Sequence, residues 1–322
     1  MTPQLSIIIS TFNRKDILLR ALKGFEQQTA QAEILEILVI DDGSTDETAA
    51  AVADFALASP ITIRCLANPR KGPGSARNYG IKEAKGALIL LGDDDIIPSP
   101  VLVAEHVAWN RKYPADNFAM MGHVSWSPEV HPTPFMEWLG LDGVLFGFGR
   151  LTPGKEVSFQ YSYFCNTSVK RDFLIRGGMF NENFRGYGSE DTELGYRLIN
   201  RGFHLLYNPD AIGYHYKHFS YAAACRRLEL MYATKVFLDT TEAGQALNEQ
   251  ASRAKPPTLK RRLMLATAKV INPFLTPLIP LLDTQVRLPR IVYSLLYFFH
   301  AAPKAQARFA RSIEQHQDAR TG

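Results

Sequence analysis

The stretch that decides the fold is residues 87–97, ALILLGDDDII. Five apolar residues, a glycine and three aspartates predict a buried strand that ends in the carboxylates Asp93, Asp94 and Asp95. Carboxylates beyond the C-terminal end of a strand lie where open α/β sheets bind their ligands. Crowded negative charges need neutralising, and hard divalent cations prefer oxygen ligands, so a metal site is one interpretation. An acidic turn is the other, because Asp-rich loops often form turns.

The residues before this strand repeat a strand-and-helix alternation. Strands are expected at 5–10, 36–40 and 61–66, and helices at about 16–28, 45–58 and 75–84. This βαβαβαβ order predicts an α/β fold with a Rossmann-like, mostly parallel sheet flanked by helices. Ser44 followed by Glu47 matches the S-x-x-E capping box, which predicts that the second helix begins near Thr45.

The composition limits the class of protein. With 322 residues, 46% of them apolar and 21% charged, the chain is expected to form one large domain with an appendage, or two domains. A net charge of +4 without a dense basic stretch in the first two thirds argues against nucleic acid as a partner. Cys65, Cys165 and Cys225 form no CxxC pair, so we expect neither disulfides nor a zinc-thiolate site.

The two ends of the chain bear on its location. The N-terminus lacks the features of a signal peptide, and no run of 18 apolar residues predicts a spanning helix, so we expect a cytoplasmic protein. The residue pattern changes beyond residue 222, where a helix is expected at 222–238 and a linker at 246–257. Two apolar segments follow at 271–282 and 291–302, with basic segments at 260–262 and 287–290. Residues 260–302 could therefore contact the inner face of the membrane or the acceptor. The alternative is a helical appendage that packs on the remaining chain or forms a homodimer.

Polar side chains follow three of the predicted strands. Ser10, Thr11 and Asn13 follow the first strand, and Asp41 and Asp42 follow the second. Together with the aspartates at 93–95, these groups would converge on one edge of the sheet and form a pocket. Hydroxyls and a carboxylate there could accept hydrogen bonds from a nucleoside, while a metal takes the diphosphate. Turn formation is the alternative for the two aspartates at 41 and 42.

The glycine-rich stretch KGPGSARNYG (71–80) is not a known phosphate loop. A dinucleotide motif G-x-G-x-x-G would need glycine where Arg77 stands, and the chain has no GKS or GKT. A dehydrogenase or a P-loop kinase is therefore disfavoured. Arg77 lies near the start of a helix and could face phosphates, with an ion pair at the surface or core edge as the alternative.

A second acidic group and a histidine lie further along the chain. In GYGSEDTELGYRL (186–198), Glu190 and Asp191 fall in the first turn of a helix. An ionised carboxylate there could act as a base, although acids in a first turn also simply favour the helix dipole. His215 follows another short strand, and imidazole beside carboxylates and phosphate oxygens would suit Mn²⁺. A structural histidine is the alternative.

With these segments in order, the chain resembles the family 2 glycosyltransferases of the GT-A fold. The matching segments, which lie within residues 4–220, are SIIISTFNR (6–14), ILVIDDGSTDET (37–48), GPGSARNYGIKEAKG (72–86), LLGDDD (90–95), residues 164–184, GSEDTELGYRL (188–198) and AIGYH (211–215). The resemblance implies a catalytic domain at 1–222, with a nucleotide-binding half at 1–95 and an acceptor-binding half at 96–222, and leaves 223–322 as a helical C-terminal extension.

The resemblance also implies roles for single residues. The donor-binding residues would be Ser10, Thr11, Asn13, Asp42, Arg77 and Asp93. The metal ligands, for Mn²⁺ or Mg²⁺, would be Asp94, Asp95 and His215. Asp191 would be the catalytic base and Glu190 would bind an acceptor hydroxyl. Gly92 stands where family members often have an acid.

The implied function is an inverting, metal-dependent transfer of a sugar. The donor would be a nucleotide-diphosphate sugar, with UDP as the preferred nucleotide, and the acceptor a glycan or lipid-linked hydroxyl in cell-surface polysaccharide synthesis. Aromatic residues in the expected loops at 126–160 could stack on sugar rings. Two alternatives stay open: a non-catalytic module that binds sugar nucleotides or glycans, and a sugar nucleotidyltransferase.

Overall fold

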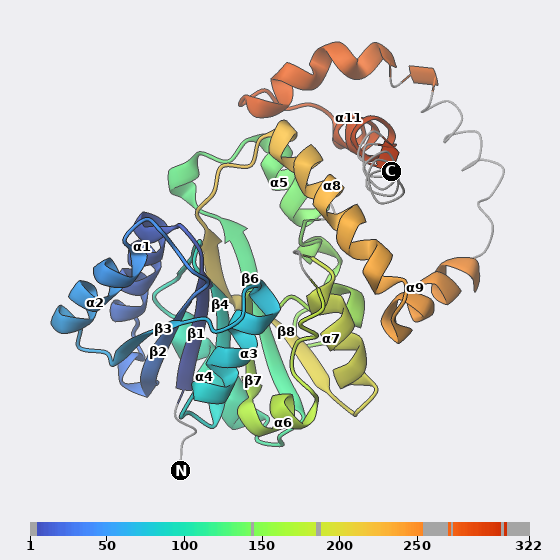
Figure 1. Cartoon of the computed structure of the whole chain (residues 1–322). Helices are drawn as coiled ribbons and strands as arrows, with labels where there is room; N and C mark the ends of the chain where they lie inside the picture. Colours follow the sequence, from blue (N-terminus) through green and yellow to red (C-terminus); the bar gives the residue numbers. More distant parts are fainter. Residues whose placement is uncertain are drawn as a thin grey trace, which may run out of the picture.

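A single mixed sheet organises the chain in the computed structural model, which describes residues 5–142, 145–184, 188–253, 270–271, 273–303 and 306–307. Within these residues the sheet has eight strands in the order β3-β2-β1-β4-β7-β6-β8-β5 (Figure 1). Their bounds are β1 Leu5–Thr11, β2 Ile34–Asp41, β3 Ile63–Ala67, β4 Leu88–Asp93, β5 Ile96–Pro98, β6 Phe118–Trp126, β7 Asn166–Lys170 and β8 His204–His215.

The predicted parallel sheet is confirmed for the first four strands. β1 pairs in parallel with both β2 and β4, and β2 pairs in parallel with β3. β7 joins β4 antiparallel, so the sheet continues into the second half of the chain with mixed direction. The carboxyl ends of β1, β2 and β4 therefore lie at one edge of the sheet, and Ser10 stands in register with Asp93.

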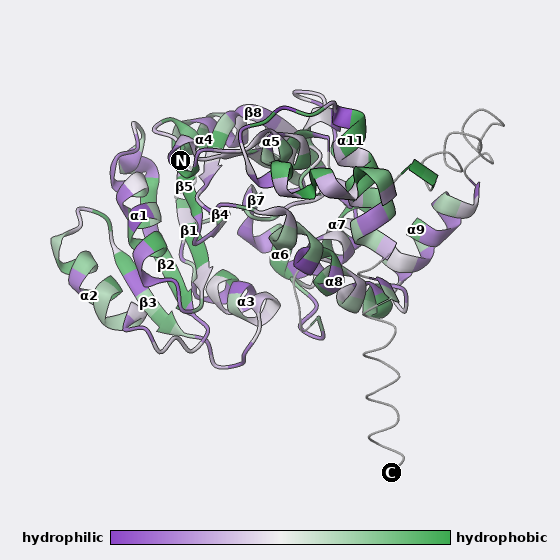
Figure 2. Cartoon of the chain, turned by 90° about the horizontal axis from the view of Figure 1, so that it is seen from above, coloured by the Kyte–Doolittle hydropathy of each residue, from purple (hydrophilic) through white to green (hydrophobic). Residues whose placement is uncertain are grey.

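Helices cover both faces of the sheet, which explains why β1 and β4 are largely buried and rich in apolar residues. Ile7 and Ile9 of β1 join the apolar cluster beneath α1 (Lys15–Glu26), α2 (Thr48–Ala58) and α4 (Leu102–Lys112). Ile8 points to the other face, towards α3 (Pro73–Glu83), α6 (Arg171–Arg176) and α7 (Glu190–Ile199). The hydropathy colouring of Figure 2 shows β1 as mainly hydrophobic.

The predicted capping box at Ser44 and Glu47 is wrong. The helix begins at Thr48, three residues later than expected, and Glu47 has a left-handed backbone with φ 64° and makes no capping hydrogen bond. Asp46 instead accepts from the Thr48 hydroxyl (2.5 Å) and from the backbone N–H of Lys15 (3.0 Å). The loop after β2 thus supports the first turn of α1, which leaves Ser44 free for a different partner, Asn13.

The aromatic stretch expected to be a sugar-stacking loop is partly a buried helix. Thr133 caps α5 (Pro134–Leu141) by accepting from the backbone of Met136. Phe135 is 1% exposed and Trp138 is 4% exposed. These two side chains serve packing and cannot reach a sugar, so that expectation is wrong for them.

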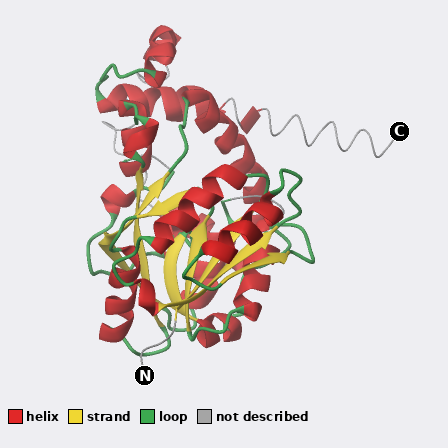
Figure 3. Cartoon of the chain, turned by 90° about the vertical axis from the view of Figure 1, so that its left-hand side faces the viewer, coloured by secondary structure: helices red, strands yellow, loops and turns green. Residues whose placement is uncertain are grey.

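Two of the C-terminal segments, at 276–283 and 290–295, contact α5, whereas the helix at 242–253 contacts α7. Figure 3 shows helices above the sheet. The helix expected at 222–238 is confirmed, and these elements are α8 Tyr221–Leu238, α9 Glu242–Arg253, η5 Thr276–Asp283, α11 Arg290–Leu295 and η6 Leu296–Ala301. The linker predicted at 246–257 is wrong up to Arg253, because those residues are helical. Residues 254–257 and the basic 260–262 lie outside the described residues.

Aromatic packing and ion pairs join these segments to the sheet domain. The ring of Tyr293 lies 6.0 Å from that of Trp138. The arginines predicted to face a membrane pair with acids near α5: Arg287 with Glu137 at 3.1 Å and Arg290 with Asp142 at 2.9 Å. In the described part of the chain, no helix is long and apolar enough to cross a bilayer.

Candidate active site

Hydrogen bonds tie the strand-end loops after β1 and β2 to each other. The backbone N–H of Asn13 donates to Ser44 Oγ (2.9 Å), and Asn13 Oδ1 accepts from the backbone N–H of Thr45 (2.7 Å). Asn13 has a left-handed backbone with φ 52°, which asparagine tolerates better than most residues. The side-chain oxygen of Asn13, a predicted donor-binding residue, thus accepts a hydrogen bond from the loop after β2.

Asp42 closes the loop that leads into α3. Its carboxylate accepts from Asn68 Nδ2 at 2.6 Å and from the backbone N–H of Gly72 at 3.1 Å. Gly72 has φ 124°, a conformation that favours glycine. Asp42 remains half-buried at the edge of the sheet, close to the end of β1, because its own N–H donates to the Thr11 carbonyl at 2.9 Å.

The acidic cluster after β4 is neutralised by an arginine that the sequence analysis did not assign. Arg14 Nη1 lies 2.8 Å from both Asp94 Oδ1 and Asp95 Oδ2. The Thr11 hydroxyl donates to Asp94 Oδ2 at 2.8 Å. Burial raises the pKa of Asp94 to about 6, although Arg14 lowers it. The only sequence signal for Arg14 was its position in the loop directly after the first strand.

The three predicted metal ligands lie at this same corner of the sheet. His215 Nε2 is 3.7 Å from Asp95 Oδ2, and burial lowers the pKa of His215, which favours the neutral form that binds metals. Among the described residues, no three His, Cys, Asp or Glu side chains group closely enough to hold an ion alone. Mg²⁺ in proteins commonly takes one or two carboxylates and completes its shell with water and substrate phosphates. The residues present fit such a partial site.

Arg77 joins the two acidic groups of the sequence. Its side chain is 5% exposed, and Nη2 lies 3.1 Å from Asp93 Oδ1. Nη1 lies 3.3 Å from Glu190 Oε1 and 3.6 Å from Asp191 Oδ1. Gly80 lets α3 approach the sheet closely, since a Cβ there would lie 2.5 Å from Ile8. Arg77 therefore forms ion pairs that join the two acidic groups, and its contact with a donor stays a prediction.

Asp191 has the environment of a base. Burial raises its pKa to about 7; Arg77 lowers it, while Glu190 and Asp93 raise it. The backbone N–H of Phe164 donates to Oδ2 at 3.3 Å, whereas Oδ1 has no hydrogen-bond partner among the described residues. Oδ1 is thus an oxygen able to accept a proton. Glu190 is fixed separately by the N–H of Gly188 at 2.7 Å.

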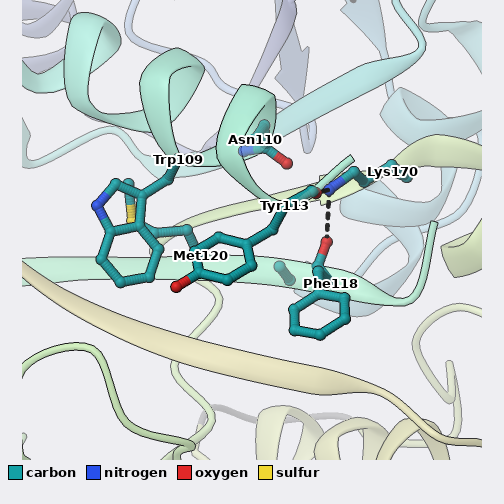
Figure 4. A pocket seen from close by; sticks show the side chains of 7 residues that line it. Trp109, Asn110, Tyr113, Phe118, Met120 and Lys170 are labelled. Atoms are coloured by element: carbon teal, nitrogen blue, oxygen red, sulfur yellow. Dashed lines mark hydrogen bonds between the residues drawn. The ribbon is translucent and has the colours of Figure 1, made fainter. Parts of the chain in front are cut away.

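A hollow at the opposite end of β4 does not compete with this site. It is lined by Trp109, Asn110, Tyr113, Phe118, Ala119, Met120 and Lys170 (Figure 4). Lys170 Nζ donates to the carbonyls of Tyr113 (2.7 Å) and Phe118 (2.9 Å), and the hollow leaves no room for a water-sized molecule. This lysine therefore serves the fold.

Solved structures with the same architecture define the class of fold. The mannosyltransferase PcManGT from Pyrobaculum calidifontis, in complex with GDP-Man and Mn²⁺, has a TM-score of 0.55 and 18% identity over 93% of this chain and 88% of that one. S. aureus TarS 1–349 in complex with UDP-GlcNAc has a TM-score of 0.52 and 16% identity, covering 97% and 92% of the two chains. The chain has the GT-A glycosyltransferase fold.

Sequence comparisons then give the family. Residues 6–141 match the model of glycosyl transferase family 2. Validoxylamine A glucosyltransferase of Streptomyces hygroscopicus subsp. jinggangensis (strain 5008) is 30% identical over 235 residues, which are 66% of this chain and 55% of that protein. Hyaluronan synthase of Pasteurella multocida is 26% identical over 91% of this chain and 31% of its own length. The chain belongs to glycosyl transferase family 2, and it spans about half the length of the validoxylamine relatives.

The family resemblance seen in the sequence is confirmed, whereas the roles of single residues stay predictions. The structure brings Thr11, Asp94, Asp95 and His215 together, and it links Asp93 to Glu190 and Asp191 through Arg77. Ser10 pairs with Asp93 in the sheet, and Asp42 lies at the same edge, where its carboxylate binds Asn68 and Gly72.

Proposed function

We propose that the chain transfers a sugar from a nucleotide-diphosphate sugar, with UDP as the preferred nucleotide, to a hydroxyl of a glycan or lipid-linked acceptor in cell-surface polysaccharide synthesis. The observation that carries the proposal is the junction of Arg77 with Asp93 at the end of β4 and with Asp191 at the start of α7. It unites the sheet edge suited to a donor with a carboxylate suited to a base. The names of relatives, among them a glucosyltransferase and a chondroitin synthase, support transfer of this kind.

The donor would lie on the edge formed by β1, β2 and β4. Ser10, Thr11 and Asp42 offer oxygen atoms for the nucleoside, and Asp93 would face the ribose and sugar. Asn13 would act here indirectly, by holding the second loop. Structural neighbours were solved with GDP-Man, UDP and UDP-GlcNAc, which supports a nucleotide donor without choosing its base.

Asp94, Asp95 and His215 would hold Mn²⁺ or Mg²⁺ together with the diphosphate oxygens. When bound, the cation supplies positive charge against the departing diphosphate. Arg14 now donates to both aspartates, and its side chain is 40% exposed, so it has solvent to move into. Arg14 would thus neutralise the two carboxylates before the donor arrives.

The reaction would be a single displacement. The acceptor oxygen forms a bond to C1 of the sugar, the bond from C1 to the diphosphate oxygen breaks, and the acceptor proton passes to Asp191 Oδ1. Arg77 keeps part of the Asp191 population ionised at neutral pH, because it opposes the effect of burial. Glu190 would orient the acceptor hydroxyl. One displacement inverts the anomeric configuration.

The buried acids favour catalysis over the two alternatives. Burial of Arg77 and Glu190, which are 5% and 3% exposed, beside two further carboxylates is costly, and a carboxylate with a raised pKa such as Asp191 is typical of catalytic sites. A sugar nucleotidyltransferase usually has a glycine-rich, basic loop after its first strand, whereas this chain has STFNRK at residues 10–15.

For the C-terminal segment we propose contact with the membrane surface, with the chain on the cytoplasmic side. Phe274 is 78% exposed and Ile291 is 55% exposed, which leaves apolar side chains for such a contact. The packing on α5 fits the appendage alternative equally well. Sedimentation with anionic vesicles separates the two, because an appendage or a homodimer would stay in the supernatant.

The proposed transfer is tested by a donor screen. UDP- and GDP-sugars are compared for thermal stabilisation of the chain with and without Mn²⁺, and the best donor is then incubated with glycan and lipid-linked acceptors. We expect one donor to stabilise the chain in a metal-dependent manner and its sugar to transfer with inversion, as read by NMR of the anomeric proton. Retention would contradict the single displacement, and release of pyrophosphate from a nucleoside triphosphate and a sugar phosphate would favour the nucleotidyltransferase.

A further inference from the structure

The strand β8 contains a bulge on its way to the proposed metal site. Its pairing with β6 runs as far as Asn208 and Gly122 and resumes with Ile212 and His123, so residues 209–211 of β8 are inserted between the two paired stretches. A bulge changes the direction and the register of the strand beyond it. This insertion therefore decides which side chains of β8 arrive at the end of the strand.

The register beyond the bulge brings His215 to the acidic corner of the site. His215 pairs with Trp126 at the end of β6 and with Ile96 of β5, the residue after Asp95. Its Nε2 lies 3.7 Å from Asp95 Oδ2 as a result. A slip of one residue would turn the histidine to the other face of the sheet. The position of this proposed metal ligand thus depends on the bulge.

The side-chain amide of Asn166 bridges the interruption in the pairing. This residue of β7 is buried, and its Nδ2 donates to the carbonyl oxygens of His123 (3.0 Å) and Ala211 (2.9 Å), one on each of the two interrupted strands. A Cβ at Gly122 would lie 2.4 Å from this nitrogen, so the close approach of the amide requires glycine there. Buried carbonyls without a partner are costly, and the amide satisfies both at once.

His106 on α4 fixes the amide from its other end. Its side chain is fully buried, with Nε2 at 2.9 Å from Asn166 Oδ1 and Nδ1 at 2.8 Å from Ser168 Oγ. Because an amide oxygen can only accept, Nε2 carries the proton, and Nδ1 accepts from the Ser168 hydroxyl. Burial lowers the pKa of His106 to about 4, which keeps the ring neutral at neutral pH. The amide of Asn166 is thus held in one orientation.

We propose that Asn166 and His106 are positioning residues that set His215 for metal binding. This inference rests on the proposed function. His106 orients the amide of Asn166, the amide holds the bulge, and the register beyond the bulge presents the histidine to the carboxylates of the proposed metal site. Glu105, the neighbour of His106 on α4, holds the start of the same bulge, because its carboxylate accepts from Asn208 Nδ2 at 2.9 Å. The helix α4 therefore anchors the bulge at two points.

The test measures Mn²⁺ affinity by calorimetric titration, with and without UDP. We expect Asn166→Ala and His106→Leu to weaken Mn²⁺ binding about tenfold or more, whereas His106→Gln, which keeps a donor and an acceptor, stays within about threefold of wild type. Val107→Ala is the matched control, since this neighbour on α4 is equally buried and packs in the other apolar cluster. It should lower the melting temperature without changing Mn²⁺ affinity. Ser168→Ala, which removes one hydrogen bond to the imidazole, replaces any variant that does not fold.

A double-mutant cycle with His215→Ala separates positioning from a general loss of structure. If Asn166 acts through His215, Asn166→Ala should weaken Mn²⁺ binding no further in a chain that already lacks the His215 imidazole. Additive losses would overturn the proposal, and so would wild-type Mn²⁺ affinity in the variants of Asn166, His106 and Ser168. A wild-type chain that bound no Mn²⁺ with or without UDP would instead contradict the metal site of the proposed function itself.

Discussion

Two arginines neutralise the acids of this site in different ways. Arg14, in the loop after β1, pairs with Asp94 and Asp95, and 40% of its side chain is exposed. Arg77, on α3, lies among Asp93, Glu190 and Asp191 with only 5% exposed. In the first group the arginine is partly in water, although the two carboxylates that it binds are buried. Arg77 is almost completely buried, and its removal would leave the carboxylates around it without a compensating positive charge.

The difference separates an exchangeable charge from a fixed one. A partner that is half in solvent can leave when a metal or a diphosphate arrives, so the donor side is suited to change its cation during a catalytic cycle. The cation beside Asp191 cannot leave, and it sets the proton affinity of the proposed base. Substitutions on the fixed side should therefore cost more than substitutions on the exchangeable side.

The largest effect is expected for Asp191→Asn. The amide cannot accept the acceptor proton, so turnover should fall on the order of 10³-fold while donor affinity stays within about twofold. Steady-state transfer rates and nucleotide titrations measure the two quantities. Asp172→Asn is the control, because that carboxylate is 79% exposed and remote in sequence from both acidic groups. Near-normal turnover of Asp191→Asn would remove Asp191 from its proposed role.

Arg77→Gln should have the next largest effect. Without the cation the pKa of Asp191 rises, so less base is ionised at pH 7 and transfer falls roughly 10- to 100-fold, with recovery as the pH increases. Loss of a buried partner should also lower the free energy of unfolding by about 3 kcal/mol or more.

The matched control for Arg77 is Arg70→Gln, which removes an arginine that is 71% exposed and pairs with Glu182. It should leave both the transfer rate and the stability close to wild type. If Arg77→Gln lost activity equally at every pH, the arginine would be needed for binding or folding rather than for the proton affinity of Asp191.

The wild-type pH profile should show the raised pKa directly. A base must be deprotonated to act, and the pKa of Asp191 is raised to about 7, so activity should rise with pH and level off above neutrality. Below pH 6 the rate should fall about tenfold for each unit. With an ordinary exposed aspartate as the base, the rise in activity would instead occur near pH 4. The pH dependence of the rate at saturating donor distinguishes the two cases.

Local patterns sufficed to find the acids but not their partners. The strand at 88–93 is predicted by its apolar run, and the helix at 190–199 by the acids in its first turn. Asp93 and Asp191 were therefore identifiable from the sequence. The contacts of Arg14 with Asp94 and of Arg77 with Glu190 span 80 and 113 residues. Such pairings depend on tertiary packing, which no single sequence pattern encodes.

The same limit explains the error at the aromatic stretch. Phe135 and Trp138 looked available for a ligand because nothing nearby in sequence covers them. Their cover includes Tyr293, more than 150 residues later, whose segment contains Pro289 and short helical turns without a clear period. Burial of an aromatic residue follows from its partners, and these partners are distant in the chain.

The smallest effect is expected for Arg14→Gln, and it tests the comparison most directly. If Arg14 neutralises Asp94 and Asp95 only until a metal ion binds, it competes with that ion for the two carboxylates. Its removal should then let Mn²⁺ bind the nucleotide-free chain a few-fold more tightly. Turnover should stay within about tenfold of wild type, since a metal ion bound to the same two carboxylates would replace the charge of Arg14. Calorimetric titration with Mn²⁺ measures the affinity, with Arg20→Gln, which pairs with exposed Glu129, as the control. Weaker metal binding, or a loss of turnover as large as that of Arg77→Gln, would mean that Arg14 is fixed like Arg77, and both arginines would then belong to the permanent structure of the site.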